Sequence, residues 1–351
     1  MIRTAAQTTG GRPPAIVRRR RTKVLLALLA AVLLPALALG AVLAAYARDV
    51  RSAEAFYAAP GEPRVDGQRV ALAPVRSLRV LPLVEWYAAR DDLETENGLS
   101  YLVQADDTTI LFDLGFNRAG SAEPPLLRNM ARLGVDPAEV DVVVASHPHN
   151  DHLGGGGGAN GDRAIVREDA DPLAGKPLYS TVPLAVSGGT STVVDAPRAL
   201  TPAVGTTGPV PVGLFLVGYT LEQALVIDLE GKGLVLVVGC GHPGVEAIVR
   251  RAEQVHERPV YAVIGGLHFP VTEDHAQIGP LRGQNLFGSP TPPWRPIAAD
   301  DVHGAIAFLR ERGVAVVGVS PHDSCDWSLA AFASAFGAGY RPVRVGEPID
   351  L

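Results

Sequence analysis

The sequence has few cysteines and lacks the motifs of several common enzyme classes. Only two of its 351 residues are cysteine, Cys240 and Cys325, so the fold does not depend on a disulfide framework. It contains no G-x-S-x-G serine elbow and no phosphate-binding P-loop. These absences disfavour a serine hydrolase and a nucleoside triphosphatase.

Acidic residues are absent from residues 1–23, a basic arm that carries six arginines and one lysine. The next segment, Val24–Ala47, has no charge and is long enough to cross a bilayer, which takes about 20 helical residues. Because a basic flank stays in the cytoplasm, everything after Arg48 is expected outside it. We predict a single-pass anchor (residues 24–47) in the cell membrane. The alternative is a signal peptide cleaved after Ala45-Tyr46-Ala47, which would give a secreted protein.

The rest of the chain is acidic. Removing the seven basic residues of the arm from a total of 31 leaves 24, against 37 acidic residues. A body of this charge is a poor partner for nucleic acid, so a small-molecule substrate is expected. Hydrophobic residues make up 47% of the chain, enough for a sizeable core. We predict a polar linker at residues 48–76 and one folded domain at residues 77–351.

The order of apolar segments predicts an α/β fold with two sheets. Three strand-like segments come first, "LRVLPLVEWY", "LSYLVQA" and "TTILFDLG", separated by polar turns. Later strands alternate with helical segments such as "VEAIVRRAEQV" and "ADDVHGAIAFLRERG". A simple doubly wound sheet would not begin with three consecutive strands, so two sheet layers, each flanked by helices, are expected.

The segment "HPHNDH" follows a buried strand-like run, "VDVVV", and holds four metal-type ligands. Residues two apart on an extended chain point the same way, so His147 and His149 can converge on one ion. Asp151 and His152, at the turn that follows, can face a second. Imidazole and carboxylate together favour zinc, with iron or manganese as alternatives, over calcium or magnesium.

Three more histidines, His242, His268 and His322, each lie just beyond the end of an apolar strand-like segment. Ligands at strand ends can meet at one edge of a sheet, so these three are candidates to complete the site. The remaining histidines downstream are interpreted as solvated or structural: His256, His275 and His303.

The segment "SHPHNDHLGG" resembles the HxHxDH signature of the metallo-β-lactamase fold, a four-layer αββα sandwich with a one- or two-metal site at its edge. Further segments are similar to landmarks of its dihydropterin synthase-like branch: "ENGLSYLVQADDTTILFDLG", "VVGCGHPGVEAIV" (GC-x-H), "AVIGGLHF" (GG-x-H) and "SPHDSCDWSLAAFASAFG". The likeness spans about residues 93–351. It is specific to fold and branch, and much less so to substrate.

The resemblance implies a role for each matching residue. Two divalent ions are implied, His147 and His149 binding the first and Asp151 and His152 the second, with Asp151 also catalytic. Further ligands are His242, His322 and His268. Cys240 stands where many members have a bridging aspartate, and both a thiolate ligand and an inert buried thiol remain open. Asp113 resembles a strand-end aspartate that orients a ligand histidine.

The chain departs from the branch at the usual HCTG, where it reads His322-Asp323-Ser324-Cys325. This departure affects the branch's particular chemistry rather than the metal site. We therefore expect an exported metallo-hydrolase that uses a metal-bound hydroxide on an ester, lactone, amide or phosphoester. The alternatives are transferase or synthase chemistry like that of the branch, or a non-catalytic metal-binding domain. β-Lactam hydrolysis is not expected.

The residues that select the substrate are not readable from a motif. The pocket is expected to be built from the weakly patterned segments Gly154–Gly218 and Val271–Ile297. In the second, Trp294 either walls the pocket or belongs to a rigid connector, and the proline-rich context favours the connector.

Overall fold

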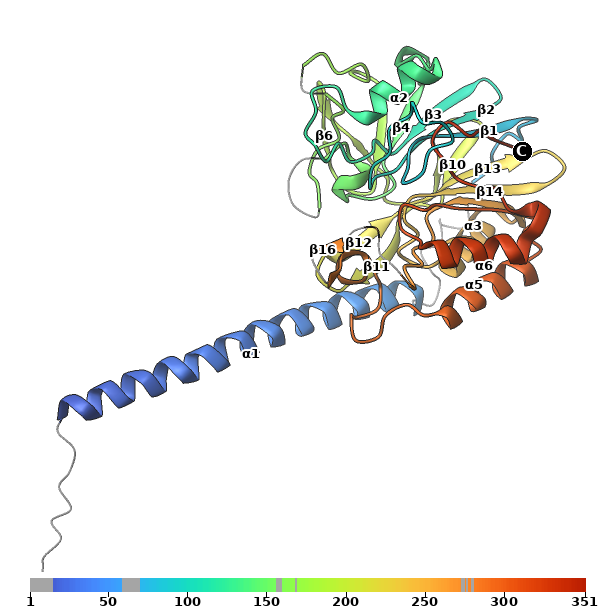
Figure 1. The fold of residues 1–351 in the computed structure, drawn as a ribbon. Coiled ribbons are helices and arrows are strands. Elements are labelled where there is room, and N and C mark those ends of the chain that lie inside the picture. The colour runs from blue at the N-terminus through green and yellow to red at the C-terminus, as the bar shows by residue number, and fades with distance from the viewer. Residues whose placement is uncertain are drawn as a thin grey trace, which may run out of the picture. The chain divides into compact units, whose positions relative to one another are not determined.

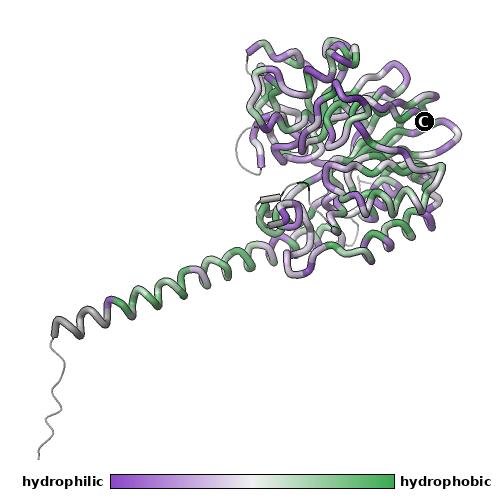
Figure 2. Tube along the Cα trace, viewed as in Figure 1, coloured by the Kyte–Doolittle hydropathy of each residue, from purple (hydrophilic) through white to green (hydrophobic). Residues whose placement is uncertain are grey.

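The computed structural model describes residues 15–58, 70–155, 160–167, 169–272, 275, 277–278 and 281–351. The chain divides into two compact units, Met1–Ala45 and Tyr46–Leu351. Helix α1 (Ala15–Ala58) belongs to both, and Leu26–Tyr57 within it is long and apolar enough to be a membrane anchor or a signal sequence (Figure 2). Residues 48–58, predicted as part of a linker, continue this helix. Residues 59–69 of that range lie outside the described residues.

The larger unit contains a sheet of seven strands. The strand order across this sheet is β19 (Ile349–Asp350), β1 (Leu78–Val84), β2 (Ser100–Ala105), β3 (Thr108–Phe112), β4 (Val142–Val144), β5 (Leu178–Ser180) and β8 (Thr192–Val193). Strands β19, β1, β2 and β3 pair antiparallel, and β3, β4, β5 and β8 pair parallel.

A second sheet of six strands packs against the first. Its order is β18 (Val316–Val319), β15 (Val260–Gly265), β14 (Gly233–Val238), β13 (Leu225–Leu229), β10 (Val204–Thr206) and β9 (Arg198–Ala199). Strands β14, β15 and β18 run parallel. Separate hairpins are formed by β11 (Val210–Leu214) with β12 (Gly218–Glu222), β6 (Ala185–Val186) with β7 (Gly189–Thr190), and β16 (Gln277–Ile278) with β17 (Leu281–Arg282).

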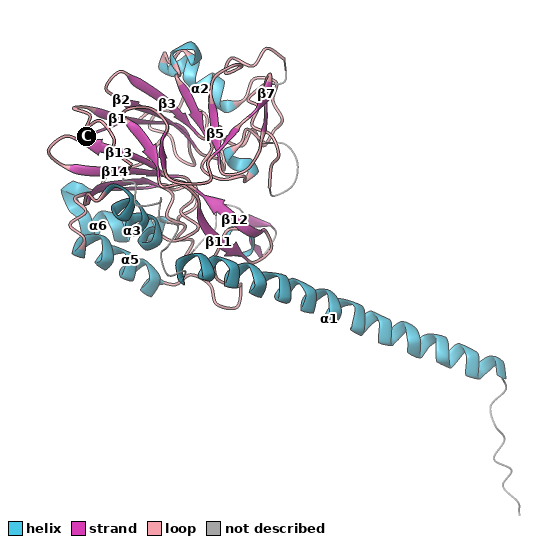
Figure 3. Cartoon of the chain, turned by 180° about the vertical axis from the view of Figure 1, so that it is seen from behind, coloured by secondary structure: helices cyan, strands magenta, loops and turns pink. Residues whose placement is uncertain are grey.

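Helices cover the outer face of each sheet (Figures 1 and 3). Helix α2 (Pro125–Leu133) packs on the seven-stranded sheet. The six-stranded sheet carries α3 (Val245–His256), α5 (Ala299–Glu311) and α6 (Asp326–Phe336), while the short α4 (Gly283–Phe287) lies in a loop. Single turns of 3-10 helix occur at Pro137–Glu139, Asn150–His152 and Gly337–Gly339. The predicted four-layer αββα sandwich of the metallo-β-lactamase type is confirmed.

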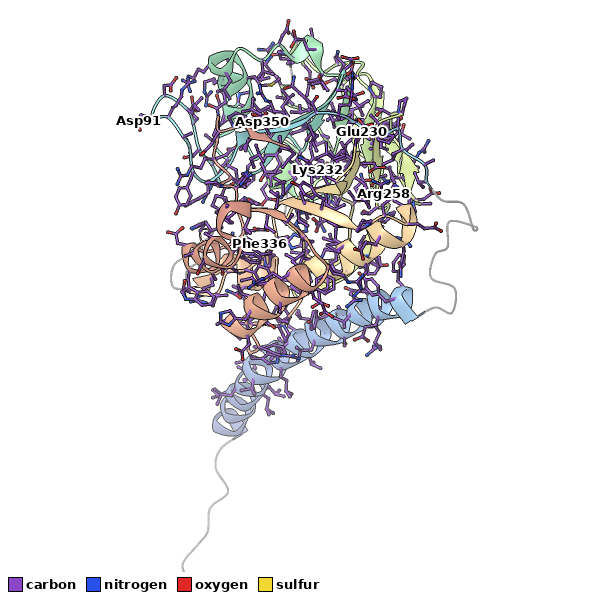
Figure 4. The ribbon with its side chains drawn as sticks, turned by 90° about the vertical axis from the view of Figure 1, so that its right-hand side faces the viewer. Asp91, Glu230, Lys232, Arg258, Phe336 and Asp350 are labelled. Carbon is purple, nitrogen blue, oxygen red and sulfur yellow. The ribbon has the colours of Figure 1, made fainter. Side chains whose placement is uncertain are left out.

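Strand β14 shows why its sequence, "GLVLVV", is apolar throughout. Side chains alternate across a strand, so Val235 and Val237 face the core between the sheets, while Leu234 and Leu236 pack against the helices. Each such fully buried side chain stabilises the fold by about 1.5–3 kcal/mol. Glu230 and Lys232, labelled in Figure 4, lie in the turn before β14. Because β14, β15 and β18 are parallel, their carboxyl ends lie together, at the end of the sheet opposite this turn.

Candidate metal centre

The turn after β4 carries a dense group of metal-type ligands. This strand of three buried valines runs on through Ser146 to His147 and His149. Nε2 of His147 lies 3.0 Å from Nδ1 of His149. His242, from the loop after β14, completes the group with its Nε2 3.2 Å from the same Nδ1 atom. Possible ligand atoms of these three histidines lie within 4.8 Å of one another, and we call them the first triad.

A second triad adjoins the first. It consists of Asp151, His152 and His322, whose possible ligand atoms also lie within 4.8 Å of one another. Oδ2 of Asp151 is 3.4 Å from Nε2 of His322, and the rings of His152 and His322 are 5.2 Å apart. His322 comes from the loop after β18, so the structure brings the HPHNDH turn together with two later strand ends.

Cys240 lies between the two triads. Its Sγ atom is 3.0 Å from Nε2 of His152, and it forms a third group of possible ligands with His147 and His152. Burial, together with the nearby carboxylates, raises the pKa of Cys240 well above its ordinary value. A bound cation would reverse this electrostatic balance and favour the thiolate. Both Cys240 and Cys325 are free, buried thiols.

Asp113 orients two of the histidines, His152 by direct contact and His147 through the hydroxyl of Ser146. Its Oδ2 atom lies 2.7 Å from Nδ1 of His152 and also accepts a hydrogen bond of 2.7 Å from the Ser146 hydroxyl. The Ser146 oxygen is in turn 2.8 Å from Nδ1 of His147. Asp113 is held in the left-handed region, with φ of 61°, at the end of β3. A carboxylate at Nδ1 fixes the ring so that Nε2 faces the site, the role expected for this residue.

The histidines differ in charge. Burial alone would lower the pKa of His152, but the charges of Asp113 and Asp151 outweigh it and raise that pKa to about 9. Burial lowers the pKa of His149 to about 4, and it lowers those of His147 and His242 still more clearly with the help of neighbouring histidines. The first triad is therefore neutral at pH 7, the form in which imidazole binds metal.

Glycines let the loops after β14 and β15 approach closely. A Cβ on Gly239 would lie 2.6 Å from the Cβ of Ser146, and a Cβ on Gly241 would lie 2.5 Å from the carbonyl oxygen of Gly266. Gly241 also has φ of 71°. The GCG sequence around Cys240 is thus required by packing, because larger residues would push the thiol away from His152.

Glu222 is a site residue that the sequence did not reveal. It is buried at the end of β12, where its carboxylate accepts hydrogen bonds from the backbone N–H groups of Gly241 (2.7 Å) and His242 (2.8 Å). Burial raises its pKa to about 7. The adjacent Gln223 donates to the carbonyl of Ala145. A polar pair directly before the apolar run "ALVIDL" was the available signal.

His268 lies at the wall of the site but outside both triads. Its ring is 5.0 Å from that of His242, and its Nε2 atom is 3.2 Å from the Ser289 hydroxyl. Its backbone has φ of 55°, and its N–H donates to Oδ2 of Asp323. Asp323 and the following Ser324, which replace the usual residues after the histidine of HCTG, thus fix the loop that carries His268. Its assignment as a ligand stays a prediction.

The triads open into a cavity of about 290 Å³. Part of its wall comes from the two segments expected to build it, through Val217 and the α4 region. Asn97, in the landmark segment "ENGLSYLVQADDTTILFDLG", also lines the cavity, as do Phe116 and Arg118 from the loop after it, which no motif marked. Trp294 is absent from the lining and is 65% exposed. The connector interpretation of Trp294 therefore fits its position.

The donor set fits a divalent transition metal. In the first triad, Nε2 of His147, Nδ1 of His149 and Nε2 of His242 converge at separations of 3.0 and 3.2 Å. Neutral imidazoles that converge in this way offer lone pairs that a metal ion would bind. Imidazole, carboxylate and thiol are the ligands that zinc prefers, and iron and manganese accept the first two.

Comparisons with known proteins agree with the fold. The family described as the metallo-beta-lactamase superfamily matches residues 93–255. A 7,8-dihydropterin-6-methyl-4-(beta-D-ribofuranosyl)-aminobenzene-5'-phosphate synthase from Methanocaldococcus jannaschii is 27% identical over 260 residues, which cover 62% of this chain and 86% of that protein. A crystal structure of a metal-dependent hydrolase of the β-lactamase superfamily has 18% identity and a TM-score of 0.54, covering 78% of this chain and 99% of its own.

The family match covers the HPHNDH turn and the strand β4 before it. The comparisons agree with the two-sheet architecture and with a His-rich group of possible metal ligands at its edge. The chain therefore resembles the metallo-β-lactamase superfamily in its fold and in this His-rich turn.

Proposed function

We propose that this protein is an exported, membrane-tethered, metal-dependent hydrolase of a small molecule. The observation that carries the proposal is the pair of adjoining triads at the floor of one cavity. His147, His149 and His242 would hold one divalent ion, and Asp151, His152 and His322 a second, with zinc the preferred metal. Paired ions of this kind lower the pKa of bound water and polarise a carbonyl or phosphoryl oxygen.

The residues around the triads have defined tasks in such a reaction. Asp113 orients His152, and Glu222 fixes the backbone of Gly241 and His242. Asp151 lines the cavity, so its carboxylate could bind an ion and hold the attacking water by accepting a hydrogen bond from it. Its pKa is held far below the usual range, because the charges of His152 and His322 outweigh burial.

Membrane tethering is supported by the course of helix α1. A signal peptidase cut after Ala47 would fall inside this continuous helix and remove Tyr46. Tyr46 donates a hydrogen bond of 2.6 Å to the carbonyl of Pro290. This contact favours an uncleaved anchor, with the folded unit on the extracytoplasmic side as the basic arm predicts.

The test is turnover of chromogenic esters, lactones, amides and phosphodiesters by the full chain loaded with zinc, iron or manganese. We expect activity on at least one class that falls by at least about 100-fold in Asp151→Asn. Asp141→Asn, an exposed aspartate away from the site, is the matched control. Nitrocefin should not be cleaved. Metal binding without turnover of any substrate would favour a non-catalytic metal-binding domain.

Synthase chemistry is the second candidate, favoured by the similarity to the archaeal synthase. An extracytoplasmic location argues against it, because phosphorylated pterin intermediates are cytosolic. Product formation from a pterin phosphate, dependent on the same Asp151, would support this candidate over the hydrolase.

A further inference from the structure

An apolar surface platform surrounds the first residue of the larger unit. We define the platform as Tyr46, Phe215, Leu216 and Trp294. The ring of Phe215 makes edge-on contacts with Tyr46, at 5.6 Å, and with Trp294, at 5.4 Å. Leu216 is 45% exposed and Trp294 65% exposed. Large apolar side chains grouped on a surface in this way mark a contact with another apolar phase.

The residues directly after the apolar span pack against the hairpin that carries part of the platform. Tyr46 is bonded to Ala45, the last residue of the smaller unit, and the next turns of α1 lie beside the β11–β12 hairpin (Figures 1 and 3). A Cβ on Gly213 would lie 2.6 Å from the backbone nitrogen of Val50, so only glycine permits this approach. The hydroxyl of Tyr57 also donates to the carbonyl of Pro211. The part of α1 that belongs to the larger unit is therefore packed on this hairpin through Val50 and Tyr57.

The platform and the cavity rim belong to the same two chain segments. Val217, which lines the cavity, follows Leu216 in the turn of the β11–β12 hairpin. Phe287 and Gly288 also line the cavity, and Pro290 accepts the hydrogen bond from Tyr46. The mouth of the cavity thus has an apolar side, and that side continues into the platform.

Charges beside the platform favour a lipid bilayer as this apolar phase. Arg51 and Arg295 are exposed near Tyr46, and Arg48 is exposed while paired with Asp49, although the exported body as a whole is acidic. Tyrosine and tryptophan concentrate at the membrane–water interface, where arginines meet lipid phosphates. A partner protein would not need to lie at the end of an apolar helix.

We propose that the platform rests in the interfacial layer of the membrane, so that the cavity takes an amphiphile with a long hydrocarbon chain directly from the bilayer. The chain would pass Val217 and Phe287, leaving the bond to be cleaved at the triads. The cleavage itself rests on the proposed function. One water is consumed: its hydroxyl joins the acyl or phosphoryl atom, and a proton leaves with the alcohol.

The first test needs no catalysis. Full-length protein is reconstituted in vesicles of phosphatidylcholine and phosphatidylglycerol, with and without bromine on acyl carbons, and its tryptophan fluorescence is measured. Trp294 is one of three tryptophans, so the difference between the wild type and Trp294→Phe isolates its signal. We expect bromine quenching of this signal, because bromine quenches only on contact within the bilayer. Equal quenching in both proteins would overturn the proposal.

The second test compares a long-chain ester in the same vesicles with a short, soluble ester. Leu216→Asp should lower the ratio of the two turnover rates about tenfold, since it removes one large apolar contact with the lipid. Val193→Asp, a position of similar exposure (38%) on β8, should leave the ratio unchanged. An unchanged ratio in Leu216→Asp would contradict the substrate class.

The two tests separate this inference from the proposed function. Quenching of Trp294 without turnover of either ester would support the platform and count against the hydrolase. Self-association of the chain that Leu216→Asp abolishes, without quenching, would assign the platform to a second copy and overturn the inference.

Discussion

Cys240 is the site residue whose protonation depends most on whether a metal ion is bound. Its sulfur touches His152 and lies between two groups of ligands, yet without a cation its pKa is raised by burial and by carboxylates. The close packing of Gly239 and Gly241 holds the thiol in this place. An inert thiol would need no such fixed approach to a histidine, so we favour the ligand role.

Replacing Cys240 tests that role. Cys240→Ser keeps the size of the side chain but removes the thiolate, so metal affinity should fall about 10- to 100-fold. The measurement is competition with a chromophoric chelator. Cys325→Ser is the matched control, because that buried thiol contacts Thr272 and Ser328 rather than a ligand. Equal affinities in the wild type and Cys240→Ser would identify Cys240 as an inert core residue.

The density of histidines made part of the site predictable at this scale. Four metal-type ligands share one turn, and a shared metal site is the simplest reason for such a density: His147, His149, Asp151 and His152. Glu222 could not be predicted from the sequence, because its role depends on which backbone N–H groups its carboxylate accepts hydrogen bonds from. That partner, the loop at Gly241, is a contact across strands that no local pattern encodes.

At the scale of elements, parallel strands explain why distant histidines meet. His242 and His322 follow β14 and β18, and the parallel pairing through β15 places their ends at one edge. The apolar runs predicted these strands and therefore this meeting. The wall of the cavity was less predictable. Asn97, Phe116 and Arg118 come from irregular loops, whose course is set by tertiary contacts rather than by periodicity.

One such loop is fixed by an ion pair to helix α2. Glu94 accepts hydrogen bonds from Arg128 and Arg132, with its side chain one-third exposed. These partners, the Arg128 hydrogen bond foremost, lower the pKa of Glu94 below its ordinary value of 4.5. A lowered pKa contributes stability above that ordinary value, and the contribution is lost as the pH falls through the folded-state pKa.

Glu94→Gln should therefore destabilise the fold by about 1–2 kcal/mol at pH 7. The difference from the wild type should shrink as the pH falls below 4.5, the ordinary pKa of the carboxyl group. Thermal denaturation across this pH range measures it. Asp92→Asn removes a surface ion pair with Arg90, whose two side chains are about half exposed, and should leave the melting temperature nearly unchanged. A pH-independent loss in Glu94→Gln would refute the electrostatic explanation.

At the scale of the whole molecule, one helix links an apolar span to a folded domain. The predicted span was visible in the sequence as an uncharged run. The continuation of helix α1 through Ala58 was not, because its polar, alanine-rich composition suits both a tether and a solvated helix. Its packing against the β11–β12 hairpin distinguishes the two.

Retention of the N-terminus follows from that packing. We predict that protein extracted from membranes of expressing cells has the intact mass of the complete chain and resists alkaline carbonate extraction. As a control, a variant truncated to begin at Arg48 should appear in the soluble fraction. A wild-type protein that is soluble and begins at Arg48 would instead identify residues 1–47 as a cleaved signal peptide.

The metal content of the purified full-length protein tests the central claim most directly. We predict about two zinc, iron or manganese ions per chain, as expected for paired sites. His242→Ala and His322→Ala should each lose about one ion, because each removes one of three ligands from a different triad. His303→Ala, which contacts Trp327 away from the site, should lose none. One ion or none, unchanged by His242→Ala and His322→Ala, would mean that the fold is present without its dinuclear chemistry.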